Sequence, residues 1–177
     1  MKLDGLTEVE LEACGEALGA VLCSGDVVLL DGPMGAGKTT FTRALARGLG
    51  ITRPERVRSP TFNICMVHDG PVPLVHVDLF RLAQDEDAEP GAEVGAAAFE
   101  ALGLEALADR LASPANGDDA GVLVIEWANL WASPMGDCLR IALDISGEQD
   151  RRDLRMSAEG ARHQQRMAAW QRARAES

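Results

Sequence analysis

Short apolar runs alternate with stretches of helical periodicity along the chain. Near the N-terminus, Thr7 and Glu10 form a capping-box pair, and the apolar positions after them predict an opening helix that ends near Ser24. The run from Val27 to Leu30 is short and wholly apolar, which is typical of a buried strand. A glycine-rich turn then leads into a second helical stretch, from Lys38 to about Leu49. This part of the chain predicts the order helix, strand, helix.

The rest of the chain contains further strand-like segments. Residues 59–70, "SPTFNICMVHDG", close on an Asp69-Gly70 turn, and residues 73–80, "PLVHVDLF", predict a strand that could pair with them as a hairpin. Residues 121–128, "GVLVIEWA", predict a buried strand. The segments "CLRIALDI" and "RRDLRMSA" alternate on either side of the turn "SGEQD", which predicts an antiparallel pair. Ser157 is then expected to cap a C-terminal helix over residues 157–174.

This order of elements predicts the fold class. Strands separated by helices indicate an α/β protein with a largely parallel central sheet, flanked by helices and completed by an antiparallel C-terminal edge. A chain of 177 residues with 46% hydrophobic content is long enough for one well-cored domain, so we expect a single domain over residues 1–177. Within it, residues 84–121 carry ten acidic side chains against one arginine and predict an acidic insert of helix and loop.

The turn after the first apolar strand carries the clearest chemical signal. Residues 32–39, "GPMGAGKT", fit G-x-x-x-x-G-K-[ST] at every fixed position, between a strand and a helix. Glycine lets successive backbone N–H groups point inward at one anion, and the following helix adds its positive N-terminal end. Lys38 is expected to reach the β- and γ-phosphates, and Thr39 to offer its hydroxyl to Mg²⁺. The sequence therefore predicts a P-loop NTPase-like site.

The charge distribution limits the partners. The net charge is −11, but residues 1–150 carry ten basic and 25 acidic side chains, whereas residues 151–177 carry seven arginines and three acids. An acidic body repels polyphosphate, which disfavours direct, tight binding of nucleic acid. The N-terminus "MKLDGLTEVE" is acidic where a signal peptide is basic, and no apolar run approaches the ~20 residues that span a bilayer. We expect a cytoplasmic protein with no membrane contact.

Two apolar strands end in a carboxylate. "LVHVD" ends in Asp78 and "VLVIE" ends in Glu126, and ligands of such sheets bind beyond the carboxyl ends of the strands. A P-loop enzyme needs one acid near Mg²⁺ and a group that positions or deprotonates the nucleophile. The segment "VRSPTFN" lies between the phosphate-loop helix and the strand that ends at Asp78, where switch-like loops of P-loop NTPases are found. Thr61 in this segment could offer a hydroxyl to the γ-phosphate or the metal, although a plain turn explains the same residues. Trp127 directly follows Glu126, where core packing is the default for an aromatic side chain.

Taken together, "GPMGAGKTTFTRALARGLG", "VRSPTFN", "HVDLFRL" and "IEW" resemble the TsaE (YjeE) family over most of the chain. This is a family of bacterial P-loop ATPases of tRNA threonylcarbamoyladenosine biosynthesis. The resemblance implies an ATP hydrolase that works with the TsaB and TsaD proteins while threonylcarbamoyl is attached to the adenosine next to the anticodon. It implies ATP and Mg²⁺ at the site, and contact with tRNA only through the complex.

The resemblance also assigns roles to residues. It implies that Asp78 and Glu126 serve in metal binding or catalysis together with Thr39, and that Lys38 and Thr61 take part in catalysis. It implies a nucleotide-binding set made of the phosphate loop and three residues outside it: Gly35, Ala36, Gly37, Lys38, Thr39, Thr40, Thr7, Trp127 and Arg152. The chain departs from the family pattern in the residues "EWANLW", where a proline commonly follows the tryptophan, and in its long acidic stretch.

Three rival functions fit parts of the pattern. A P-loop small-molecule kinase has this size and phosphate chemistry, but it usually closes an arginine-bearing lid over the transferred phosphate. Between the two strand-end acids only Arg81 and Arg110 are basic. A GTP-driven switch lacks its Asn-Lys-x-Asp signature in this chain. A nucleotide-sensing module without turnover is opposed only mildly, by the presence of Asp78 and Glu126.

Overall fold

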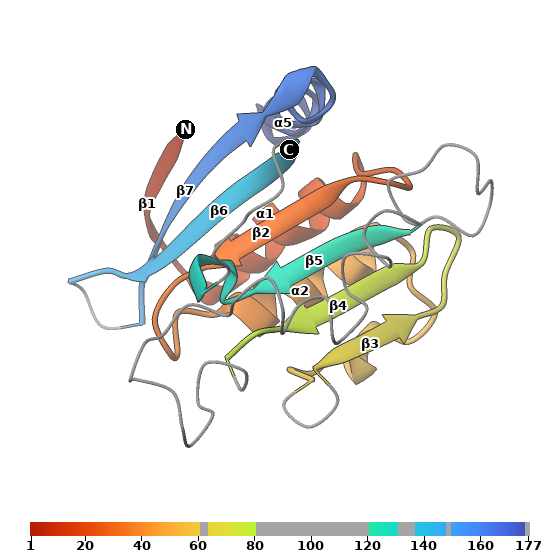
Figure 1. Ribbon diagram of the computed structural model, residues 1–177. Helices are drawn as coiled ribbons and strands as arrows, with labels where there is room; N and C mark the ends of the chain where they lie inside the picture. Colours follow the sequence, from red (N-terminus) through yellow and green to blue (C-terminus); the bar gives the residue numbers. More distant parts are fainter. Residues whose placement is uncertain (61–63, 81–120, 131–136, 148–149, 176–177) are drawn as a thin grey trace.

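The computed structural model describes residues 1–60, 64–80, 121–130, 137–147 and 150–175. Its strands form one sheet, and its helices lie beside that sheet (Figure 1). The elements follow in the order β1 (Lys2–Leu6), α1 (Glu8–Gly19), β2 (Val27–Asp31), α2 (Lys38–Gly48), η1 (Pro54–Arg56), β3 (Cys65–His68), β4 (Leu74–Asp78), β5 (Val122–Glu126), η4 (Ala128–Leu130), β6 (Cys138–Ile145), β7 (Arg152–Glu159) and α5 (Gly160–Ala175).

The sheet has seven strands in the order β1-β7-β6-β2-β5-β4-β3. Its centre is parallel, because β2 pairs in parallel with β6 and β5, and β5 with β4. The predicted hairpin of β3 and β4 is confirmed, and so is the antiparallel pair of β6 and β7. The predicted α/β class with a largely parallel centre is therefore confirmed, and the sheet has antiparallel pairs on both sides of that centre.

The strand β1 is absent from the elements that the sequence pattern predicted. It pairs antiparallel with β7, with Leu3 opposite Leu154, and its register shifts before Leu6. Its backbone also bonds to a side chain of a distant segment, since the Gly5 amide donates to Asp153 Oδ1 at 2.8 Å. Five residues with one partner at the opposite end of the chain carry little local signal, which is why the strand was missed.

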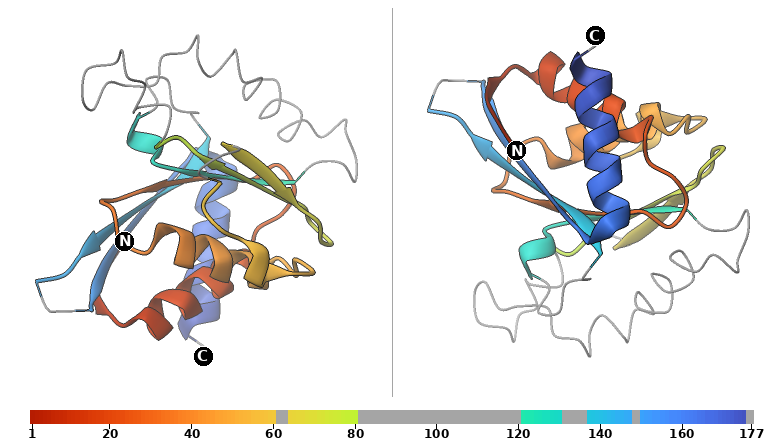
Figure 2. Two further views of the ribbon diagram at one scale, coloured as in Figure 1. Left: turned by 90° about the horizontal axis from the view of Figure 1, so that it is seen from below. Right: turned by 90° about the horizontal axis from the view of Figure 1, so that it is seen from above.

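The helices α1, α2 and α5 lie on one face of the sheet (Figure 2). That face buries a cluster in which Leu11 and Leu18 of α1 meet Phe41 and Leu45 of α2. Trp170 of α5 is fully buried in the same cluster, and its indole N–H donates to the Cys14 carbonyl of α1 at 2.9 Å. The central strands are apolar on both sides, as expected for parallel strands, because alternate residues of β2 belong to two different core clusters.

The opening helix is shorter than the pattern predicted. It ends at Gly19 rather than near Ser24. The Asp26 carboxylate accepts the Cys23 amide at 2.8 Å, and the Gly25 amide donates to the Gly121 carbonyl at 2.8 Å. These contacts turn the chain into β2 and end the helix early.

The predicted helix start at Ser157 is wrong. Ser157 belongs to β7, where it pairs with Arg140 of β6, and the strand continues to Glu159. The helix begins at Gly160, whose φ of 78° is unfavourable for a residue with a side chain. Pairing with β6 therefore outweighs the local tendency of Ser157 to cap a helix. Gly160 allows the abrupt change from strand to helix.

A cluster around Asp26 fastens α5 to the sheet. Asp26 is fully buried, and its two oxygens accept Arg162 Nε at 2.6 Å and Arg166 Nε at 2.7 Å. Next to it, the Val27 amide donates to His163 Nε2 at 3.0 Å, and Nδ1 of that ring lies 2.6 Å from Asp137 Oδ1. Two of the seven arginines of the C-terminal segment thus have a structural role, since they neutralise one buried acid.

Two sequence expectations, the acidic insert and the lack of membrane contact, can be compared only with the described residues. The acidic insert predicted over residues 84–121 lies outside them, apart from Gly121. Among the described helices, none combines the length and the apolar character that crossing a membrane requires.

Candidate nucleotide site

The glycine-rich loop connects β2 to α2 at the carboxyl edge of the parallel strands. Gly32 has a φ of 143°, and a Cβ there would lie 2.2 Å from the Leu143 carbonyl oxygen of β6, so no larger residue fits. Gly37 precedes the helix with a φ of 95°, in the left-handed region. These glycines place the backbone of the loop and the N-terminus of α2 around one concave region, the arrangement that binds anions.

Lys38 lies inside this loop and is 5% exposed. Its ammonium donates to the carbonyl oxygens of Gly32 at 2.7 Å and Pro33 at 2.9 Å. It also lies 3.6 Å from the centroid of the Trp127 ring, a cation–π distance. Burial lowers the pKa of Lys38, and the nearby carboxylate charges of Glu126 and others oppose that effect. The structure therefore holds the one charged donor of the loop between its backbone and an aromatic face.

Asp78 and Glu126 lie side by side at the ends of β4 and β5. They are register partners in the parallel ladder, and Glu126 is also the partner of Leu30 at the end of β2. Together with Lys38 and Thr39 they line one cavity of about 400 Å³, which we call the acid cavity; its other lining residues are Met34, Gly35, Gly37, Thr40, Ser59, Phe80 and Trp127. Two strand-end acids and the phosphate loop thus meet at one place.

Glu126 is 1% exposed and has a partner on each oxygen. Its Oε2 accepts the Thr39 hydroxyl at 3.0 Å. Its Oε1 lies 3.0 Å from the Thr42 hydroxyl and 2.8 Å from His76 Nε2. The carboxylate is therefore fixed against the first turn of α2, with one oxygen directed at the residue predicted to bind Mg²⁺.

Asp78 is held from the loop side of the cavity. Its Oδ2 accepts the Ser59 hydroxyl, and its Oδ1 accepts the Phe80 amide at 3.0 Å. Ser59 belongs to the "VRSPTFN" segment, so that segment touches the site as expected of a switch-like loop. Thr61 itself lies outside the described residues.

Trp127 is half-buried and has a φ of 60°, which is unusual for a large residue. Its amide donates to the Leu30 carbonyl at 2.9 Å, and its ring lies 4.6 Å from the Phe80 ring centroid. The ring therefore lies at the wall of the acid cavity, in contact with the Lys38 ammonium. Core packing, the default expectation for this position, describes only its contacts with neighbouring apolar residues.

A second cavity lies on the other side of the loop. It has a volume of about 500 Å³ and shares Gly35, Gly37 and Thr40 with the acid cavity; we call it the flanking cavity. Thr7 and Arg152 both line it, and Arg152 Nη2 donates to the Gly35 carbonyl at 3.1 Å. The structure thus brings these two residues, far apart in sequence, to the same loop.

The oxygen donors of the acid cavity suit Mg²⁺. Magnesium prefers hard oxygen ligands and is commonly held by one or two carboxylates together with substrate phosphates. Thr39, Asp78 and Glu126 supply a hydroxyl and two carboxylates at one cavity wall. Among the described residues no group of three or more His, Cys, Asp or Glu side chains could hold a metal ion by itself. The donor set fits a metal that is shared with a phosphate ligand.

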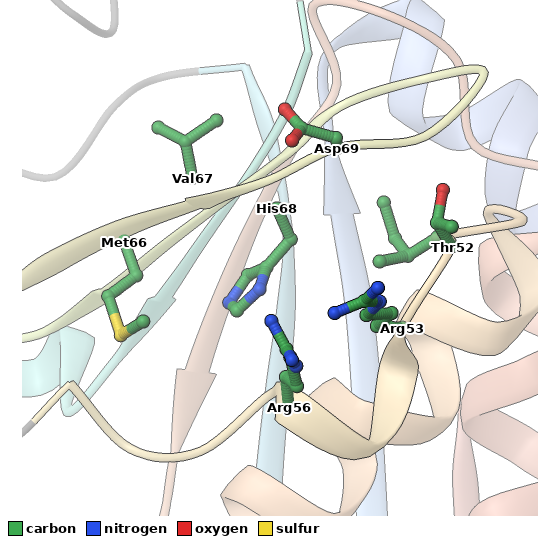
Figure 3. A pocket seen from close by; sticks show the side chains of 8 residues that line it. Thr52, Arg53, Arg56, Met66, Val67, His68 and Asp69 are labelled. Atoms are coloured by element: carbon green, nitrogen blue, oxygen red, sulfur yellow. The ribbon is translucent and has the colours of Figure 1, made fainter.

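A third cavity, of about 400 Å³, lies between η1 and β3 (Figure 3). Arg53 and Arg56 extend into it from one side, and His68 from the other (Figure 3). None of the predicted site residues lines this cavity.

Two residues that contact Glu126 behind the acid cavity were missed by sequence reasoning. Thr42 follows Lys38 by one helical turn and therefore lies on the same side of α2. His76 precedes Asp78 by two positions in β4, which puts the two side chains on one face of the strand. The spacing offered both signals, but only the folded sheet places these residues against Glu126.

The fold and the site define an α/β protein that carries a phosphate-loop sequence at the carboxyl edge of a parallel sheet. A family model described as "Threonylcarbamoyl adenosine biosynthesis protein TsaE" matches residues 6–154. The chain therefore belongs to the TsaE family.

Individual relatives agree with this assignment. The chain is 36% identical over 157 residues to a Bacillus subtilis "tRNA threonylcarbamoyladenosine biosynthesis protein TsaE", covering 88% of this chain and 84% of that protein. A Streptomyces coelicolor protein of the same name is 53% identical over 73 residues, which are 39% of this chain and 47% of that protein. The solved "Crystal structure of Bacillus subtilus YdiB" has a TM-score of 0.68 at 26% identity, over 97% of this chain and 94% of that one.

Proposed function

We propose that this protein is a Mg²⁺-dependent ATPase that acts with TsaB and TsaD when threonylcarbamoyl is attached to the tRNA adenosine next to the anticodon. One observation carries the enzymatic part of the proposal. Lys38 and Thr39 of the loop line the same cavity as Asp78 and Glu126, the acids that end two adjacent parallel strands. A phosphate loop needs such acids for turnover, whereas phosphate binding alone does not require them.

The two cavities that share the loop suggest how ATP binds. The triphosphate lies along Gly35 to Thr40, the segment that contributes to both cavities. The γ-phosphate end enters the acid cavity beside Lys38. The nucleoside end occupies the flanking cavity, where Thr7 and Arg152 are the polar contacts. We expect ATP to bind more tightly than GTP because the chain contains no guanine-reading Asn-Lys-x-Asp segment.

The acid cavity divides the remaining tasks among its residues. Thr39, Asp78 and Glu126 would hold Mg²⁺, which neutralises phosphate charge when it is bound. Glu126 positions water or completes the metal shell. Thr61, in the switch-like loop, offers its hydroxyl to the γ-phosphate or the metal. Lys38 compensates charge on the transferred phosphate, which grows in the transition state.

The biosynthetic role and the partners rest on the family. The family and its curated relatives are named for tRNA threonylcarbamoyladenosine biosynthesis. The net charge of −11 opposes direct binding of tRNA and favours contact through the partner proteins. Partner-dependent turnover is therefore the form of ATPase activity that we propose.

The test is phosphate release from Mg²⁺-ATP by the protein alone and with TsaB and TsaD. We expect turnover that rises with the partners, that stops when the metal is chelated, and that falls at least ~10³-fold in Lys38→Ala, since a phosphate-stabilising charge is lost. Lys2→Ala is the matched control, because Lys2 is exposed and pairs with Asp4 at 2.9 Å. Equal turnover in folded Lys38→Ala and wild type would refute the site, and transfer of the phosphate to a small molecule would favour the kinase.

A further inference from the structure

His76 makes a contact with Glu126 that the proposed function does not yet use. It lies in the middle of β4, is fully buried, and places Nε2 at 2.8 Å from Glu126 Oε1. An ionised carboxylate only accepts hydrogen bonds, so the hydrogen in this contact belongs to Nε2. The ring therefore acts as a hydrogen-bond donor to the acid at the phosphate loop.

The other donors to Glu126 have competing partners. The Thr42 hydroxyl has one hydrogen, but it lies 3.0 Å from both Glu126 Oε1 and the Lys38 carbonyl, which are both acceptors. The Thr39 hydroxyl, which donates to Oε2, is the group expected to bind Mg²⁺. Among the described residues, His76 is thus the one donor to this carboxylate whose hydrogen has no second acceptor and which is not itself expected to bind the ligand.

The surroundings of His76 leave it no second task. Its Nδ1 is buried and has no hydrogen-bond partner among the described residues. The ring centroid of His68 lies 6.4 Å from that of His76, and His68 lines the third cavity (Figure 3). A buried ring with one used nitrogen has no evident reason to be polar except for the bond that it makes.

We infer that His76 is a positioning residue for Glu126: it holds Oε1, so that Oε2 remains directed at Thr39 and the bound nucleotide. This inference rests on the proposed ATPase function. A carboxylate that has lost its dedicated donor can rotate within the cavity, and its alignment matters most in the transition state. Ground-state nucleotide binding depends mainly on the loop and Lys38, so it is affected little.

Three substitutions separate positioning from simple packing. His76→Gln places its amide nitrogen where Nε2 lies, whereas in His76→Asn the side chain is one methylene shorter and its amide nitrogen reaches only the level of Nδ1. His76→Leu offers no donor. We expect kcat for ATP, measured with the partner proteins, to fall roughly 10- to 100-fold in the Leu and Asn variants and to recover largely in the Gln variant. The affinity for a non-hydrolysable ATP analogue should stay within about threefold in all three. Equal losses in Gln and Asn, or a parallel loss of affinity, would overturn the inference.

A double-mutant cycle tests the route of the effect. If His76 acts through Glu126, then His76→Leu should have no further effect on kcat when Glu126 is already glutamine. His76→Leu leaves the buried charge of Glu126 without its donor, and this can prevent folding. Glu126→Gln removes that charge, so the double variant can then be compared with Glu126→Gln alone. Multiplicative losses would mean that His76 acts elsewhere. Wild-type protein without ATP turnover would refute the proposed function, whereas turnover that His76 variants leave unchanged would refute only the positioning role.

Discussion

Glu126 and Asp26 are both acids buried at ends of the same sheet, yet their surroundings differ in charge. Asp26 is paired with the guanidinium groups of Arg162 and Arg166 and also accepts the Cys23 amide at 2.8 Å. Glu126 has hydroxyl and imidazole partners, and no lysine or arginine forms an ion pair with it among the described residues. Burial alone therefore does not identify a functional acid. The difference is that two arginines neutralise the charge of Asp26, whereas we propose that the charge of Glu126 serves a ligand.

Removal of the buried Asp26 carboxylate is predicted to cause a large loss of stability. Asp26→Ala leaves two arginines beside a buried site without their partner, and removal of one member of a buried pair costs about 3–5 kcal/mol. We expect the lower end, near ~3 kcal/mol, because Arg162 and Arg166 are 37% and 26% exposed. Denaturant unfolding measures the change.

The matched control for that measurement is Asp144→Ala. Asp144 pairs with Arg155 at 3.6 Å, and both side chains are more than half exposed, so the expected loss is below ~1 kcal/mol. If Asp26→Ala were as stable as this control, Asp26 would not be the structural acid of the pair.

The position of positive charge around the loop provides a smaller test. Arg152 donates to the Gly35 carbonyl and lines the flanking cavity, away from the buried acids. Arg152→Ala should weaken binding of an ATP analogue about 3- to 10-fold and leave kcat at saturating ATP unchanged, because its contact is the same in ground and transition states. Arg155→Ala, on the same strand and exposed, is the control. A fall in kcat without a change in affinity would show that Arg152 acts in catalysis and not in nucleotide binding.

The smallest expected effect is a shift in the titration of Lys38. Burial lowers its pKa and the charge of Glu126 raises it, so Glu126→Gln should lower the Lys38 pKa further, moving its titration to lower pH. Asp26→Asn should leave it unchanged. The chain contains two lysines, so NMR of labelled lysine side chains can follow Lys38 with Lys2 as the internal reference. An unchanged Lys38 pKa in Glu126→Gln would mean that Glu126 contributes no charge at the loop.

The two acids also differ in how far the sequence could predict them. Glu126 ends an apolar strand, and a strand end in an α/β sheet is a recognisable location for a ligand. Lys38 and Thr39 belong to a contiguous motif. For these residues the signal is local, so the sequence pattern alone predicts that they share one site.

The partners of both acids come from distant segments. Asp26 meets Arg162 and Arg166 only because α5 packs back across the start of β2. His76 reaches Glu126 only because β4 and β5 are neighbours in the sheet. The same reason explains the missed β1, whose partner strand lies at the other end of the chain, and the helix start at Ser157 that the β6–β7 ladder overrides. Local patterns predict elements and motifs, but not which side chain satisfies which buried charge.

The most direct test of this account compares Glu126→Gln with Asp26→Asn in one assay. Mg²⁺-ATP hydrolysis is measured with TsaB and TsaD present, at a temperature where both variants are folded, alongside equilibrium binding of a non-hydrolysable ATP analogue. We predict that Glu126→Gln lowers turnover by roughly 10²-fold or more with much less change in affinity, as for a lost general base, while Asp26→Asn turns over ATP at the wild-type rate. Wild-type turnover in Glu126→Gln, or equal losses in the two variants, would contradict the claim that Glu126 is the functional acid.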